Sequence, residues 1–191
     1  RRLGRAQHFT HVFANLGASP GSAQGDAVRV PVRHASNPAL SPDGKRIVFS
    51  WAGDLWAGRA GGGLAKRLTA HPGYETDPAF SPDGTQIAFT SNRNGPDQVF
   101  VVAAAGSLPR QVTFHSEGSR VVEWYPDGRS LLVEGLRDFG SKSASRFYRV
   151  ELGERKAERL LFDAEGHSGA LSPDGRRLLF CREGSDLHRK G

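Results

Sequence analysis

The tetrapeptide Ser81-Pro82-Asp83-Gly84 has three counterparts in this chain of 191 residues, and its composition is that of a tight turn. Proline presets φ at the second turn position, aspartate can hydrogen-bond its own backbone, and glycine accepts positive φ at the end. Short apolar runs flank it at 78–80 and 86–89, which is typical of a β-hairpin. The counterparts are Ser41-Pro42-Asp43-Gly44, Tyr125-Pro126-Asp127-Gly128 and Ser172-Pro173-Asp174-Gly175.

The spacing of these turns indicates a repeated structural unit. Their prolines stand at positions 42, 82, 126 and 173, so they are 40, 44 and 47 residues apart. Four strands in a unit of about 40 to 45 residues are the signature of a β-propeller blade. The sequence therefore predicts an all-β fold, a partial β-propeller with three four-stranded blades plus a truncated fourth. The third and fourth strands of the complete units are expected near 55–57 and 66–69, 98–102 and 110–113, and 147–150 and 158–161.

The repeat also divides the chain. Residues 34–191 are predicted to form an incomplete propeller, and residues 1–33, which do not repeat, a flexible leader or linker. The fourth unit has one hairpin and the start of a third strand at 185–188. Because propellers close with about four to eight blades, we expect the remaining blades to lie in a longer parent chain. The predicted blades are 34–71, 72–115, 116–163 and, in part, 164–191.

Composition excludes several classes of protein. No apolar run is long enough to span a membrane, and the single cysteine, Cys181, excludes a disulfide framework and a cysteine-based zinc site. The net charge of +6 invites a nucleic-acid function, but the basic residues alternate with apolar ones and form no patch. We therefore expect no nucleic-acid partner, no membrane span, no metal and no cofactor. Cys181 lies on a predicted inner strand and is expected to be a buried, unreactive thiol. The compartment, cytoplasmic or exported, stays open.

Two histidines occupy equivalent places in successive units. His71 and His115 each stand 11 residues before the proline of the next turn. One interpretation is a repeated structural hydrogen bond that fixes the connection between blades. The other is a set of imidazoles at one mouth of the propeller channel, where they could contact a peptide or a partner.

An insertion lengthens the third unit between its second and third strands, at residues 135–145. Loops on a rigid scaffold often carry binding residues. We expect Arg137, Asp138 and Lys142 either to contact a peptide or a neighbouring domain, or to belong to a plain surface loop.

Two serines look like nucleophiles in the sequence. The segment 17–21 fits the G-x-S-x-G pattern, but Pro20 has no N–H to offer an oxyanion hole. Ser168 follows His167, yet neighbours on an extended strand point to opposite faces, so a blade-entry loop is expected there. No catalytic residue is predicted. Aromatic residues are predicted to pack between blades, as packed sheets require; they are Trp51, Trp56, Trp124, Phe49, Phe80, Phe89, Phe100, Phe114, Phe147 and Phe180.

The repeat resembles a known family. Ile-Ala-Phe-Thr-Ser-Asn-Arg at 87–93 and Asp-Gln-Val-Phe at 97–100 look like the TolB-type, WD-like propeller repeat. Stretches 68–72, 122–128, 146–150 and 182–191 are similar to the N-terminal propeller of tricorn-type serine proteases.

This resemblance implies a function. In tricorn-type proteases the propellers are thought to admit or sieve peptides on their way to a C-terminal catalytic half. The chain would then be a non-catalytic propeller segment, with every catalytic residue beyond Gly191. Its partners would be peptides or proteins, the remaining blades and the catalytic domain. The alternative is a TolB-like module that binds protein partners and has no enzyme attached.

Overall fold

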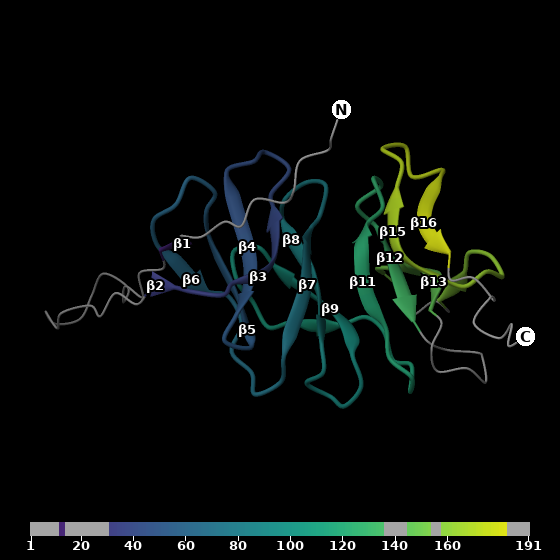
Figure 1. The fold of residues 1–191 in the computed structure, drawn as a ribbon, viewed down its shortest axis with the longest axis horizontal. Helices are drawn as coiled ribbons and strands as arrows, with labels where there is room; N and C mark the ends of the chain where they lie inside the picture. Colours follow the sequence, from purple (N-terminus) through teal and green to yellow (C-terminus); the bar gives the residue numbers. More distant parts are fainter. Residues whose placement is uncertain (1–11, 14–30, 136–144, 154–157, 183–191) are drawn as a thin grey trace, which may run out of the picture.

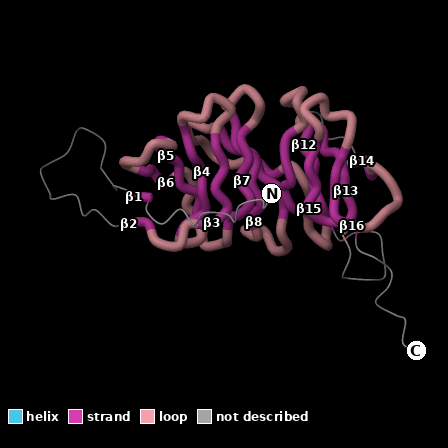
Figure 2. The backbone as a smooth tube through the Cα atoms, turned by 45° about the horizontal axis from the view of Figure 1, so that its top comes forward, coloured by secondary structure: helices cyan, strands magenta, loops and turns pink. Residues whose placement is uncertain are grey.

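The structure is a computed structural model that describes residues 12–13, 31–135, 145–153 and 158–182. Within these ranges every regular element is a β-strand, which confirms the all-β prediction. Three antiparallel four-stranded sheets and one two-stranded sheet stand side by side as successive blades (Figures 1 and 2). Each complete sheet pairs its strands in chain order.

The strands follow the repeat. Blade one contains β3 (Ser36–Leu40), β4 (Arg46–Trp51), β5 (Asp54–Arg59) and β6 (Ala65–Arg67). Blade two contains β7 (Glu75–Phe80), β8 (Gln86–Ser91), β9 (Gln98–Ala103) and β10 (Arg110–Gln111). Blade three contains β11 (Arg120–Trp124), β12 (Ser130–Gly135), β13 (Arg146–Glu151) and β14 (Arg159–Leu160). Blade four contains β15 (Gly166–Leu171) and β16 (Leu178–Arg182).

The repeated turn forms through its own side chains. The Ser81 hydroxyl donates to Asp83 Oδ1 at 2.6 Å and accepts the Gln86 N–H at 2.9 Å. The N–H of Gly84, at φ +69°, donates to the Ser81 carbonyl at 2.8 Å. The Ser81 hydroxyl bond holds the pKa of the Asp83 carboxyl below its ordinary value. Because these bonds span only a few residues, the turn can form wherever the tetrapeptide occurs.

The glycine of the turn gives a direct test of this geometry. Gly44 has φ +67° and no atom within 4 Å of where a Cβ would stand, so Gly44→Ala changes the backbone energy without a clash. We expect this substitution to lower the free energy of unfolding by about 1 kcal/mol, measured by urea denaturation. Gly61 is the matched control, since it also has open space but no left-handed φ. An equal loss of unfolding free energy for Gly61→Ala would contradict the conclusion that the left-handed φ of Gly44 causes the effect.

The first strand of several blades carries a β-bulge with a left-handed residue. The pairing register shifts inside β3, β7 and β15. The residues there are Asn37, Asp77 and Ser168, with φ of 50°, 51° and 55°. A bulge of this kind re-aims a side chain and commonly lies beside functional sites. The first strands of neighbouring blades also contact one another, so they line the inner side of the row of blades.

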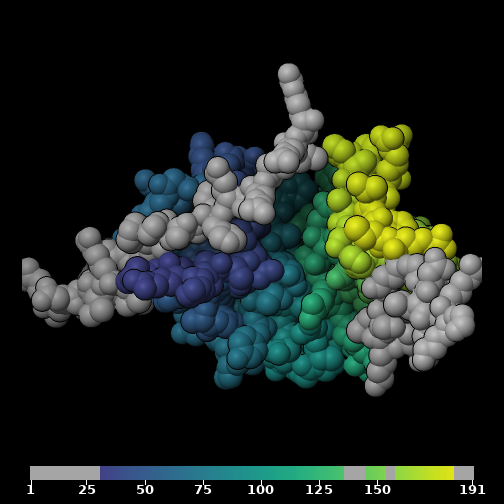
Figure 3. All heavy atoms as spheres, in the orientation of Figure 1, coloured from purple at the N-terminus to yellow at the C-terminus, as the bar shows by residue number. Residues whose placement is uncertain are grey.

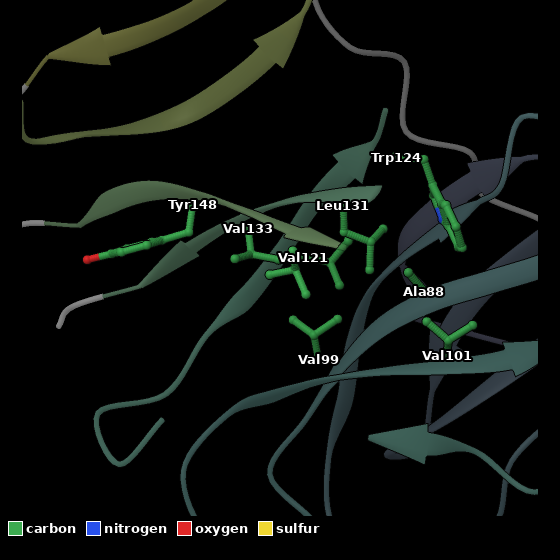
Figure 4. Packing of buried hydrophobic residues seen from close by; sticks show 9 residues of the cluster. Ala88, Val99, Val101, Val121, Trp124, Leu131, Val133 and Tyr148 are labelled. Carbon is green, nitrogen blue, oxygen red and sulfur yellow. The ribbon is translucent and has the colours of Figure 1, made fainter. Parts of the chain in front are cut away.

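Apolar side chains from adjacent sheets form the core. Between blades two and three, Ala88 and Val99 meet Leu131 and Val133, and the Trp124 indole N–H crosses to the Ala79 carbonyl at 2.9 Å (Figure 4). A second cluster joins blades one and two, and a third joins blades three and four. The predicted packing of aromatic residues between blades is confirmed for Phe89, Phe100, Trp124 and Phe147, which are at most 6% exposed and belong to these clusters. Phe49 and Trp56 are also at most 6% exposed, but they pack against Val32 and not between blades.

Two burial predictions are wrong. Phe114 is 61% exposed, because it lies on the connection after β10 and outside the sheet. Cys181 is exposed although it lies on β16. It faces away from blade three, on the side where none of the described residues packs.

The segment predicted as a leader contains two short strands. β1 (Val12–Phe13) pairs antiparallel with β2 (Pro31–Val32). Val32 is buried against Phe49 and Trp56. β2 therefore covers the face of blade one that points away from blade two. The proposed boundary at residue 33 stays a prediction.

Candidate functional site

A cavity of about 360 Å³ lies between blades two and three, where the connection from β10 enters β11. The Ser119 N–H donates to the Asp97 carbonyl at 2.7 Å and fixes this connection. Gly118 is required there, because its φ is +87° and a Cβ would lie 2.9 Å from the same carbonyl oxygen. The cavity is lined by Asp97, Glu117, Gly118, Ser119, Arg120, Glu134, Gly135 and Ser145.

The charges of this cavity are mainly negative, in contrast to the net +6 of the chain. Arg120, the one cation among the described residues that line it, is engaged with Asp97 through Nε at 2.8 Å and Nη2 at 2.7 Å. This hydrogen bond raises the pKa of Arg120. Burial raises the pKa of the Glu134 carboxyl, and nearby Asp77 adds to this effect, while Arg120 and His167 oppose it. Among the described residues, no hydrogen bond reaches the Glu134 carboxylate. The cavity can therefore accept a hydrogen-bond donor that carries positive charge.

The two predicted histidines make the same local hydrogen bond. His71 Nδ1 accepts the Gly73 N–H at 3.0 Å, and His115 Nδ1 accepts the Glu117 N–H at 3.2 Å. This is the repeated bond of the structural interpretation. Because Glu117 lines the cavity, His115 lies two residues from its rim. Contact of either histidine with a peptide stays a prediction.

The predicted contact residues of the insertion, Arg137, Asp138 and Lys142, lie outside the described residues. The residues on either side of them are placed. Gly135 and Ser145 both line the cavity, and Ser145 is fixed by its hydroxyl bond to the Gly166 carbonyl at 2.7 Å. The insertion therefore leaves and rejoins the sheet at the cavity.

Sequence reasoning missed the four charged residues of the cavity, Asp97, Glu117, Arg120 and Glu134. One signal could have found Glu134. It stands eight residues after its turn proline, where blades one and two have Ser50 and Thr90. In blade two this position serves the backbone, since Thr90 Oγ accepts the Val121 N–H of blade three at 3.0 Å. In blade three Glu134 replaces the hydroxyl side chain that blades one and two have at this position, and this departure from the repeat is the sequence signal.

The prediction that His167 and Ser168 point to opposite faces is wrong. His167 Nδ1 lies 2.9 Å from Ser168 Oγ, because the left-handed φ of Ser168 turns its side chain back. The same left-handed residue occurs in β3 and β7 as Asn37 and Asp77. The bulge therefore belongs to the blade and is not peculiar to a serine–histidine pair.

A second cavity of about 680 Å³ lies beside the turn of blade three. Its Arg149 is engaged: Nη2 donates to Asp127 at 2.5 Å and to Ser130 at 2.9 Å, and the guanidinium lies 4.1 Å from the centre of the Tyr125 ring. We prefer the first cavity as the candidate site because Glu134 has no comparable partner.

The described part of the chain contains no group of three or more His, Cys, Asp or Glu side chains that could hold a metal ion. It also contains no helix long and apolar enough to cross a membrane.

Comparison with solved structures shows the propeller fold. The putative TolB from Agrobacterium tumefaciens has a TM-score of 0.70 and 17% identity, over 86% of this chain and 62% of that one. TolB from Acinetobacter baumannii has a TM-score of 0.66 and 22% identity, over 92% of this chain and 47% of that one. The tricorn protease has a TM-score of 0.60 and 22% identity, over 74% of this chain and 14% of that one. The chain thus spans less than two thirds of each of these proteins, and identities at this level show the fold alone.

Comparison of sequences identifies the family. No curated protein matches the chain. The family model described as the tricorn protease N-terminal beta propeller domain matches residues 32–190, which include all four blades. The chain therefore belongs to the family of tricorn protease N-terminal β-propeller domains.

Proposed function

We propose that this chain is a non-catalytic propeller segment of a tricorn-like serine peptidase and guides peptides toward a catalytic domain outside residues 1–191. Family membership supports the parent enzyme. The observation that supports a role in guiding peptides is the cavity between blades two and three, which is mainly negative although the chain has a net charge of +6. A peptide brings an ammonium group at its N-terminus or on lysine, and carboxylates attract it.

The geometry suggests how a peptide would be held. The ammonium group would donate to Glu134 and to Asp97 Oδ1, while Arg120 stays on Asp97 Oδ2. Arg137, Asp138, Lys142, His71 and His115, the contact residues predicted from the sequence, would be further contacts of the peptide.

Glu134→Gln tests this proposal. We expect the chain to bind a fluorescent peptide with a free N-terminus about 1.4- to fivefold more weakly after this change, because a partly exposed charge pair contributes about 0.2–1 kcal/mol. Binding is measured by fluorescence anisotropy. In the unsubstituted chain, binding should also weaken as pH falls through the raised pKa of Glu134, since the protonated acid no longer attracts a cation.

Two comparisons make this test specific. Glu151→Gln removes the same charge from the second cavity and should leave peptide affinity unchanged. N-acetylation of a lysine-free peptide should reproduce the loss seen with Glu134→Gln. Equal weakening by both glutamine variants would reject the cavity as the peptide site.

The insertion has its own test. Joint substitution of Arg137, Asp138 and Lys142 by alanine should weaken peptide binding; unchanged affinity would leave the insertion a plain surface loop. The TolB-like alternative predicts a different outcome for the chain as a whole. It would bind folded proteins and show no measurable affinity for short peptides.

A further inference from the structure

The turns that join the first two strands of each blade lie together at one end of the molecule. They contact one another along the row of blades, since a Cβ on Gly84, Gly128 or Gly175 would stand 3.5, 3.9 or 2.8 Å from the proline of the preceding turn. The turn of blade four forms part of the upper edge of the molecule in Figure 3 (yellow). We call this side of the molecule the turn end.

Three of the four turns present a cation at the turn end. The residue after the turn glycine is Lys45, Arg129 or Arg176, and each is exposed. Their backbone N–H groups donate to Oδ1 of the turn aspartate at 3.1, 2.8 and 3.1 Å, while their side chains form no hydrogen bond or ion pair with the described residues. The turn aspartates are already bound, by the turn serine or, for Asp127, by Arg149. The cations are therefore the charges available to a partner.

Two exposed leucines lie on connections that begin at the same end. Ala60 and Ala104, which open the connections after β5 and β9, each donate a backbone hydrogen bond to the residue after a turn glycine, at 2.9 and 2.8 Å. On these glycine-containing connections Leu64 is 54% exposed and Leu108 is 93% exposed. Each is followed two residues later by an exposed cation: Lys66 and Arg110.

The two ends of the blades differ in charge. The candidate cavity, with Asp97, Glu117 and Glu134, lies at the opposite end, where β11 begins and β12 ends. Along the sequence the basic residues alternate with apolar ones, and the cations of the turns lie far apart. The fold brings these cations to one end because each occupies the same place in its blade.

We propose that the turn end binds the surface of an anionic lipid bilayer. Lys45, Arg129 and Arg176 would lie on the lipid phosphates, and Leu64 and Leu108 would enter the boundary of the acyl chains. Attraction to anionic lipids and burial of apolar side chains together determine the strength of such binding. The proposal does not depend on the peptide-guiding function, and the cavity would face away from the bilayer.

The leucines favour a bilayer over other anionic partners. A nucleic acid would attract the same cations, but its phosphate backbone offers no apolar surface to cover Leu64 and Leu108. An acidic protein would need two apolar pockets at the fixed separation of these side chains. Lipid chains rearrange around each leucine, so a bilayer accepts them wherever the two connections place them.

Binding to vesicles tests the role of the cations. The 191-residue chain should sediment with vesicles of phosphatidylcholine and phosphatidylglycerol in roughly equal parts, and not with phosphatidylcholine alone. Joint substitution Lys45→Ala and Arg129→Ala should weaken this binding by about tenfold or more. Joint substitution Arg33→Ala and Arg182→Ala removes the same charge from the opposite end of blades one and four, where both residues are exposed, and should change binding by less than about twofold. Equal weakening by the two pairs would overturn the proposal.

A second pair of substitutions tests the leucines. Leu64→Ser and Leu108→Ser together should weaken binding to the anionic vesicles by about tenfold at unchanged charge. Leu179→Ser is the control, since Leu179 is 78% exposed but lies within β16, away from the turn end. Failure of the unsubstituted chain to bind the anionic vesicles would overturn the proposal. Tighter binding to duplex DNA, unchanged by the two serine substitutions, would also overturn it, because the turn end would then be a nucleic-acid site.

Discussion

Phe89→Ala should lower the free energy of unfolding by about 3–5 kcal/mol, the usual cost of removing a buried phenylalanine ring. Phe89 is 0% exposed and joins blades one and two, packing with Val48 and lying 5.8 Å from the Phe100 ring centre. The guanidinium of Arg93 also lies 5.4 Å from its ring centre. The measurement is denaturant unfolding followed by tryptophan fluorescence.

Phe114→Ala is the control for this prediction. Phe114 is 61% exposed, so its removal should change the unfolding free energy by about 0.5 kcal/mol or less. Similar losses for the two variants would mean that the interface between blades one and two contributes little to stability.

Glu75→Ala should be comparably destabilising, by about 3–5 kcal/mol, because it leaves a buried cation without its partner. The Glu75 side chain is 0% exposed and that of Arg93 is 12% exposed. The Glu75 carboxylate accepts hydrogen bonds from Arg93, from the Thr69 hydroxyl and, at 3.3 Å, from the Leu55 N–H. It therefore ties the end of blade one to the start of blade two.

A double-mutant cycle isolates the ion pair from this network. Arg93→Ala should be destabilising alone, and the variant lacking both side chains should lose less than the sum of the single losses. Glu75→Gln should fall between wild type and Glu75→Ala, since the amide oxygen can still accept the Leu55 N–H. Strict additivity of the two alanine variants would show that the pair does not act as a unit.

The repeated turn explains why so much of the fold could be predicted. Its bonds join Ser81, Asp83 and Gln86, which are close in the chain, so a four-residue pattern suffices to place a hairpin. The shared Pro-Asp-Gly turn, repeated at a blade-sized interval, then gives the number and order of the sheets. Burial of Phe89 and Trp124 also followed, because apolar residues flanking such turns have only adjacent sheets to pack against.

The misplaced residues have a common cause. The exposure of Phe114 and Cys181 depends on which residues pack against them, and the direction of the Ser168 side chain depends on the bulge in β15. The alternation of apolar residues along a strand describes neither of these. Glu75 was not singled out for the same reason. Its partners Thr69 and Arg93 come from the connection after β6 and the turn after β8, and only packing of the two blades brings them together.

The sequence by itself determined the blade, its turn and the family, because these depend on hydrogen bonds and apolar alternation within a few residues. The tertiary structure alone decided the candidate site. Asp97 precedes β9, Glu117 and Arg120 lie at the entry to β11, and Glu134 ends β12. Their charges act together only because two sheets pack side by side, and the strength of such interactions depends on distance and burial, which no local pattern encodes.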